Sequence, residues 1–181
     1  MSCQNLVPLF GSVVTGAAAF LGVVLSNRSN FNRMKLENEM EASRRRIDLH
    51  RDRGEELYMV VDKWLTGFGM NGISLISVMR GKISYNQYLD IRLNPDNKPD
   101  YDFTRVEMII DVYFPQVRPF YDQVTEARAV ANEISAAHKR EYEVGNTDGQ
   151  AFINPFIEAQ ENFAAAGERL KDQIKQCLKA V

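Results

Sequence analysis

The residues most suggestive of chemistry in this 181-residue chain are three glycines in the stretch GFGMNG, at positions 67–72. Their spacing fits G-x-G-x-x-G, which wraps the pyrophosphate of a dinucleotide where a buried strand turns into a helix. An acidic residue is also needed about twenty positions later, and Asp90 stands at a suitable distance. The preceding stretch YMVVDKWLT, however, carries Asp62 and Lys63 in its middle and keeps a helical period. We therefore interpret the pattern as a chance match and expect the glycines to end a helix and bend the chain.

Two groups of polar side chains are weaker candidates for a site. Asp48, His50 and Asp52 alternate like metal ligands on a strand, but on a helix successive members lie about 200° apart. Glu107 and Asp111 share a helix face, where a lone carboxylate pair is more often solvated or salt-bridged than catalytic.

The sequence motifs of common enzymes are also missing. Neither His has a Glu three residues before it, as di-iron helix bundles require, and no G-x-S-x-G occurs. The sequence therefore predicts no catalytic residue, no cofactor and no metal site, and we expect a protein that is not an enzyme. A reproducibly bound small molecule after purification would revive the enzyme alternative.

Near the N-terminus, twenty consecutive residues carry no charge: LVPLFGSVVTGAAAFLGVVL, at positions 6–25. As a helix this segment is about 30 Å long, the thickness of the hydrocarbon core of a bilayer. A cleaved signal peptide and a buried soluble helix are the alternatives. The lack of Lys and Arg in residues 1–5 and the length of the run disfavour them. We expect a single transmembrane helix and assign residues 1–27 to an N-terminal anchor.

Positive charges flank this span on one side only. No Lys or Arg precedes it, and six follow it within about twenty residues: Arg28, Arg33, Lys35, Arg44, Arg45 and Arg46. The positive-inside rule then places the N-terminus outside and the rest of the chain in the cytoplasm. We expect a single-pass protein of a bacterial inner membrane.

Small residues recur at four-residue spacing within the span, Ser12 with Gly16 and Ala18 with Gly22. Such pairs let a second membrane helix approach closely, so this face is a candidate for self-association into a homo-oligomer. The alternative is that small residues are simply common in membrane helices.

Beyond the span, one helical stripe advances in alternating steps of four and three. Its members are Leu36, Met40, Ser43, Ile47, His50, Gly54, Leu57, Val61, Trp64 and Phe68. From Leu57 onward every member is large and apolar, which is typical of a packed core, whereas small and polar residues interrupt the stripe before it. We expect a charged helical stalk over 28–56 and a helical bundle over 57–181.

Three sequence signals delimit further helices. Ser84 with Gln87 forms a capping box, Asp102 is a candidate N-cap, and Pro115 stops or kinks the helix that Asp102 begins. Two long amphipathic segments follow on either side of a turn at GNTDGQ, and no segment alternates with period two. The expected fold is all-α, an antiparallel cytoplasmic bundle behind a stalk and a transmembrane helix.

The stretch YFPQVRPFY is the most distinctive part of the expected bundle. Aromatic residues and Arg dominate interface hot spots, so Tyr113, Phe114, Arg118, Phe120 and Tyr121 form a candidate contact surface for a partner. The alternative is that Phe114 and Phe120 anchor the core around a kink.

The uncharged span, the charged stalk, and the stretches DFTRVEMIIDVYFP and RPFYDQVTEARAVANEI resemble small bacterial membrane-anchored helical proteins. The resemblance implies an inner-membrane setting and supplies no catalytic residue. With a net charge of -2 we expect no nucleic-acid partner. We expect the lipid bilayer and another protein as partners, and an adaptor, tether or regulatory subunit as the function. The alternative is a membrane-active toxin or defence protein that oligomerises through its span.

Overall fold

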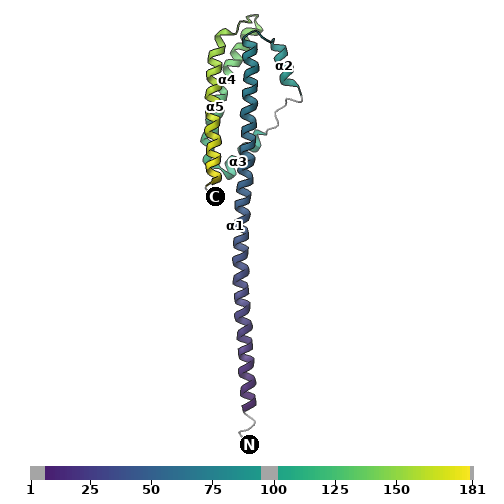
Figure 1. The fold of residues 1–181 in the computed structure, drawn as a ribbon, viewed down its shortest axis with the longest axis vertical. Coiled ribbons are helices and arrows are strands. Elements are labelled where there is room, and N and C mark those ends of the chain that lie inside the picture. Colours follow the sequence, from purple (N-terminus) through teal and green to yellow (C-terminus); the bar gives the residue numbers. More distant parts are fainter. Residues whose placement is uncertain (1–6, 95–101, 180–181) are drawn as a thin grey trace. The chain divides into compact units, whose positions relative to one another are not determined.

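The computed structural model describes residues 7–94 and 102–179, with side chains omitted for residues 7–25 and 29. Within this part the protein has five α-helices and one 3-10 turn, with no strand (Figure 1). They are α1 (Val7–Met79), α2 (Tyr85–Leu93), α3 (Phe103–Tyr113), η3 (Pro115–Val117), α4 (Arg118–Glu143) and α5 (Gln150–Lys179). The predicted all-α class is confirmed.

The chain forms two compact units, residues 1–48 and 49–181. In the first unit, α1 is a lone helix whose described side chains are all exposed. Ion pairs between residues four apart support it, among them Arg33 with Glu37 at 2.9 Å and Lys35 with Glu39 at 3.9 Å. Exposed pairs of this kind contribute about 0.3–0.5 kcal/mol each.

The predicted transmembrane segment lies outside the residues whose side chains are described. Its backbone from residue 7 onward is helical as part of α1, while the side chains of Ser12, Gly16, Ala18 and Gly22 are not described. Among the residues that the structure does describe, no helix is long and apolar enough to cross a membrane.

The predicted bend at Gly67–Gly72 is wrong, because α1 runs through these glycines to Met79. The apolar stripe does not close at Phe68. It continues in steps of four, three and four through Gly72, Leu75 and Met79, and the last two are buried. A glycine inside a helix costs about 1 kcal/mol relative to alanine, so packing from the rest of the unit outweighs this cost.

The end of α1 is set by Gly81 instead. This residue has φ of +66°, a left-handed conformation that glycine adopts without a steric penalty. Its N–H donates to Val78 O at 2.8 Å, and the N–H of Lys82 donates to Ser77 O at 2.9 Å. These two bonds are a Schellman motif, which satisfies the last carbonyls of the helix.

The second unit is built on two clusters of buried side chains. The first centres on Trp64, whose ring meets Phe103 at 5.2 Å and Phe163 at 5.7 Å between centroids, both edge-on. It joins α1, α3, η3, α4 and α5. The second joins α1, α2, α4 and α5 through Leu75, Val78, Met79, Tyr88, Ala131, Ile153, Phe156 and Ala159. In Figure 1 the C-terminal part of α1, α4 and α5 run side by side in this unit.

The predicted helix boundaries between these elements are confirmed. Ser84 and Gln87 form the capping box of α2, with hydrogen bonds of 2.8 and 3.2 Å. Asp102 accepts from the N–H of Thr104 at 2.9 Å at the start of α3, and Pro115 opens η3 directly after that helix ends. The stretch NPDNKPDYD, in which two prolines among Asp and Asn residues predict a loop, falls largely on residues 95–101, outside the described residues.

Candidate functional site

The surface of the second unit is hollowed along the seam between α1 and α5. Two adjoining hollows of about 210 and 290 Å³ share Gly69, Gln160 and Ala164 as lining residues. We call the pair the α1/α5 groove. It follows the two helices from Asp62 and Lys171 at one end to Ile76 and Ile157 at the other.

Small residues account for the depth of the groove. A side chain at Gly69 would meet nothing within 4 Å, so this glycine leaves open space beside the helix. Gly72, one turn later, is buried against Gln160, and a Cβ there would lie 2.8 Å from the amide of that side chain. Gly167 likewise receives Leu65, whose Cδ2 would be 2.5 Å from an added Cβ. The glycines thus let α1 and α5 approach closely and leave a trough above the contact.

Gln160 carries an unsatisfied donor in the wall of the groove. Its Nε2 atom is buried and has no hydrogen-bond partner among the described residues. A buried donor without an acceptor costs about 1–3 kcal/mol.

The two ends of the groove differ in chemistry. At the apolar end, Ile73 and Ile76 of α1 face Ile157 of α5, and Ile73 is 62% exposed. At the polar end, Lys171 Nζ lies 3.0 Å from Asp62 Oδ1 and 2.7 Å from Glu168 Oε1. The hydrogen bond to Glu168 raises the pKa of Lys171 above its ordinary value although burial opposes it, so this ammonium stays charged.

The rim of the groove is acidic. Asp62, Glu161 and Glu168 line it, while Lys171 is its single basic lining residue among the described side chains. An apolar floor with small residues at its centre and charges at its edges is typical of a surface that receives an amphipathic helix.

Two glycines of the groove, Gly69 and Gly72, are also among the residues whose spacing resembles a dinucleotide-binding motif. Gly69 and Gly72 belong to the G-x-G-x-x-G pattern, but no strand precedes them and they lie inside a helix. The signal that could have revealed their role is the continuation of the apolar stripe through Gly72 to Met79. Nothing in the sequence shows that Gln160 and Ala164 lie opposite them.

The predicted contact cluster lies elsewhere in the second unit. Phe114 and Tyr121 are buried in the first core cluster, and the Phe114 ring packs against the His50 ring with centroids 4.4 Å apart and the two planes tilted by 56°. Tyr113, Arg118 and Phe120 are half-buried, and Arg118 Nε donates to Asp111 Oδ1 at 2.9 Å. None of the five lines the α1/α5 groove. A partner contact by the three half-buried members stays a prediction.

The two carboxylates Glu107 and Asp111, considered for acid–base chemistry, both have structural partners. Glu107 accepts a hydrogen bond of 3.2 Å from the Tyr121 hydroxyl, and burial together with that carboxylate raises the pKa of Tyr121 to about 12. Asp111 is paired with Arg118. Among the described residues no cluster of His, Cys, Asp or Glu is arranged to hold a metal ion.

Comparison of the chain with protein-family models, with curated proteins and with solved structures gives no match.

Proposed function

We propose that this protein is a membrane-anchored helical adaptor, tether or regulatory subunit that binds a helix of a partner protein in the α1/α5 groove. The observation that carries the proposal is the groove itself. It combines an exposed apolar floor at Ile73, open space beside Gly69, and a buried Gln160 donor that lacks an acceptor. An apolar segment that covers the exposed Ile73 and fills the space beside Gly69 would remove apolar surface from water, which is favourable.

The anchoring part of the proposal rests on the sequence. Residues 6–25 have the length and the lack of charge that a bilayer span needs, and the Lys and Arg residues that follow favour a cytoplasmic bundle. Such a protein would hold its partner at the inner face of a bacterial inner membrane.

The test is co-purification with matched variants of neighbouring alanines on α5. The full chain is tagged at its C-terminus, extracted from membranes in mild detergent, and its stoichiometric partner identified by mass spectrometry. Ala164→Arg places a long charged side chain in the groove, while Ala165→Arg places the same side chain at an equally exposed position outside it. We expect the first variant to lose the partner at least tenfold and the second to retain it.

Two results would contradict this function. If both variants keep the partner equally, the groove is not its docking site. If expression instead arrests growth and depolarises cells, and replacing residues 6–25 abolishes both effects, the protein is a membrane-active effector. The small residues of the span motivate that alternative.

A further inference from the structure

The first unit presents an apolar stripe that its own chain leaves uncovered. Leu36, Met40 and Ile47 are 58%, 49% and 36% exposed, and with Ser43 they advance along α1 in steps of four, three and four. This is the spacing of the a and d positions of a coiled coil. Most of the stability of a helix in a protein comes from packing of its apolar face, so a partner that covers the stripe would stabilise this segment.

The charges beside the stripe are complementary to those of the same stripe on a second copy. In a parallel pair with Met40 and Ile47 at a positions, Glu39 takes a g position and lies opposite the e-position Arg44 of the second copy. Within one chain Glu39 is held only by a 3.9 Å contact with Lys35, and Arg44 makes no ion pair with another described residue. Two-fold symmetry forms the Glu39–Arg44 pair twice.

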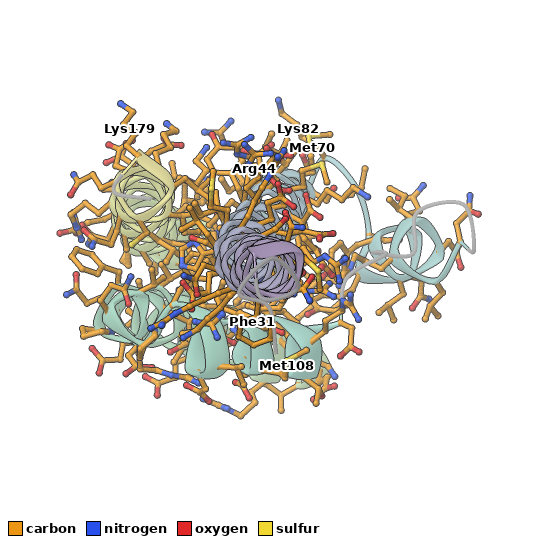
Figure 2. The ribbon with its side chains drawn as sticks, turned by 90° about the horizontal axis from the view of Figure 1, so that it is seen from below. Phe31, Arg44, Met70, Lys82, Met108 and Lys179 are labelled. Atoms are coloured by element: carbon orange, nitrogen blue, oxygen red, sulfur yellow. The ribbon has the colours of Figure 1, made fainter. Side chains whose placement is uncertain are left out.

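The sequence also limits how far this parallel pairing can extend along α1. The next flanking positions are Arg46 and Arg51, which have like charges, so the favourable segment spans residues 36–47. The opposite side of the helix carries no heptad stripe, because the polar Asn38 lies there between the exposed Met34 and Ala42. Figure 2, which looks along the helix, shows Phe31 and Arg44 leaving it on opposite sides.

We propose that two copies of this chain pair in parallel through the stripe of Leu36, Met40, Ser43 and Ile47. The parallel direction rests on the proposed anchor, because two spans that enter one membrane from the same side bring the stalks together in the same direction. The partner of this surface is therefore a second copy of the chain, distinct from the protein that would occupy the α1/α5 groove.

The test is disulfide crosslinking of the full chain in membranes, in a Cys3→Ser, Cys177→Ala background. Leu36→Cys places a thiol on the stripe, and Asn38→Cys places one on the other side of the helix as a matched control. After mild oxidation and thiol blocking, we expect most Leu36→Cys protein to run as a dimer on a non-reducing gel. We expect the Asn38→Cys protein to stay monomeric.

The crosslinks also test the direction of pairing. An antiparallel pair puts position 36 beside position 47 of the second copy, so only a mixture of Leu36→Cys and Ile47→Cys proteins would crosslink, which overturns the parallel arrangement. Equal crosslinking at positions 36 and 38 would indicate random collision and overturn the pairing altogether.

A second measurement avoids introduced cysteines. The mass of the purified chain in detergent is determined by light scattering with the detergent contribution subtracted. We expect Met40→Glu to convert dimer to monomer and Met34→Glu, an exposed methionine off the stripe, to leave the dimer intact. A monomeric wild type overturns the pairing. Recovery of the chain in the soluble fraction without detergent would instead refute the anchor, whatever the mass.

Discussion

At the scale of single residues, His138 of α4 stands out because it is completely buried and neither ring nitrogen has a hydrogen-bond partner among the described residues. Three aromatic rings surround it, those of Tyr85, Tyr142 and Phe152, with centroids 6.4, 6.2 and 5.4 Å away. Burial lowers the pKa of His138 below its ordinary value of 6.5. The imidazole is therefore neutral in the folded protein, and protonating it requires the fold to open or to accept an unpaired charge.

This gives a stability that depends on pH, with a defined sign. Because the folded-state pKa is depressed, the unfolded chain takes up the proton first, and the free energy of unfolding decreases as pH falls below about 6.5. One such group contributes up to about 1.4 kcal/mol per pH unit in that range. We expect His138→Phe to reduce the loss of stability between pH 7.5 and 5.5, measured by urea unfolding.

Other ionisable groups also respond to pH. The comparison is therefore between the wild type and His138→Phe, in the slope of the free energy of unfolding against pH. His50→Phe is the comparison variant, because the His50 ring is only partly buried against Phe114, although its Nδ1 atom also lacks a hydrogen-bond partner among the described residues. If His138→Phe and the wild type lose the same stability over this interval, His138 does not couple folding to pH.

At the scale of helices, the sequence predicted correctly where α2 and α3 begin, but it wrongly predicted a break inside α1. Ser84 and Asp102 act through hydrogen bonds to near neighbours, and Pro115 acts through its missing N–H and its ring. Local sequence is therefore enough to place the starts of α2 and α3 and the end of α3. The glycines of α1 are different, because a glycine that caps a helix and one that admits a neighbouring helix look alike in sequence.

Whether a glycine of α1 caps the helix or admits a neighbouring helix is decided by contacts with α5, which comes much later in the chain. Gln160 lies against Gly72, and Leu65 lies against Gly167, so the approach of α5 keeps α1 straight where a bend was expected. The α1/α5 groove could not be predicted for the same reason, since it exists only when these two helices are side by side.

Two glycine substitutions test this account of helix packing. Gly69 is inside α1 with open space around it, so Gly69→Ala should raise the free energy of unfolding by about 0.5–1 kcal/mol. Gly149 precedes α5, and a Cβ there would lie 2.5 Å from Met79 Cα and 2.6 Å from its carbonyl oxygen. Backbone cannot move aside as a side chain can, so Gly149→Ala should lower the free energy by about 1–3 kcal/mol.

The measurement is the thermal midpoint of each variant, which for a chain of this size moves by about 2–4 °C per kcal/mol. The shifts are expected in opposite directions. A decrease with Gly69→Ala would mean that the glycine is needed for a bend or hinge that this structure does not contain.

At the scale of the whole molecule, the two units depend on different interactions. The second unit holds the described buried hydrophobic residues, from Leu57 to Cys177, in its two core clusters. In the first unit every described side chain is exposed. Ion pairs between residues four apart, such as Arg33 with Glu37 and Lys35 with Glu39, support its helix. Burial of large apolar side chains contributes about 1.5–3 kcal/mol each, far more than such pairs. The stability of the bundle should therefore be independent of the N-terminal segment.

Removing residues 1–27 tests this independence and the anchor together. We expect the full chain to sediment with membranes and resist a high-salt wash, because apolar burial in a bilayer is insensitive to ionic strength, unlike attraction of basic residues to lipid head groups. The truncated chain should appear in the supernatant with the thermal midpoint of its bundle changed by less than about 2 °C, which corresponds to no more than about 1 kcal/mol. Adding an unrelated apolar span in place of residues 6–25 should restore sedimentation.

Two outcomes would contradict this prediction. A full chain released by salt would show that the basic residues of the stalk alone hold it at the membrane. A truncated chain that unfolds would show that the bundle needs the segment before it.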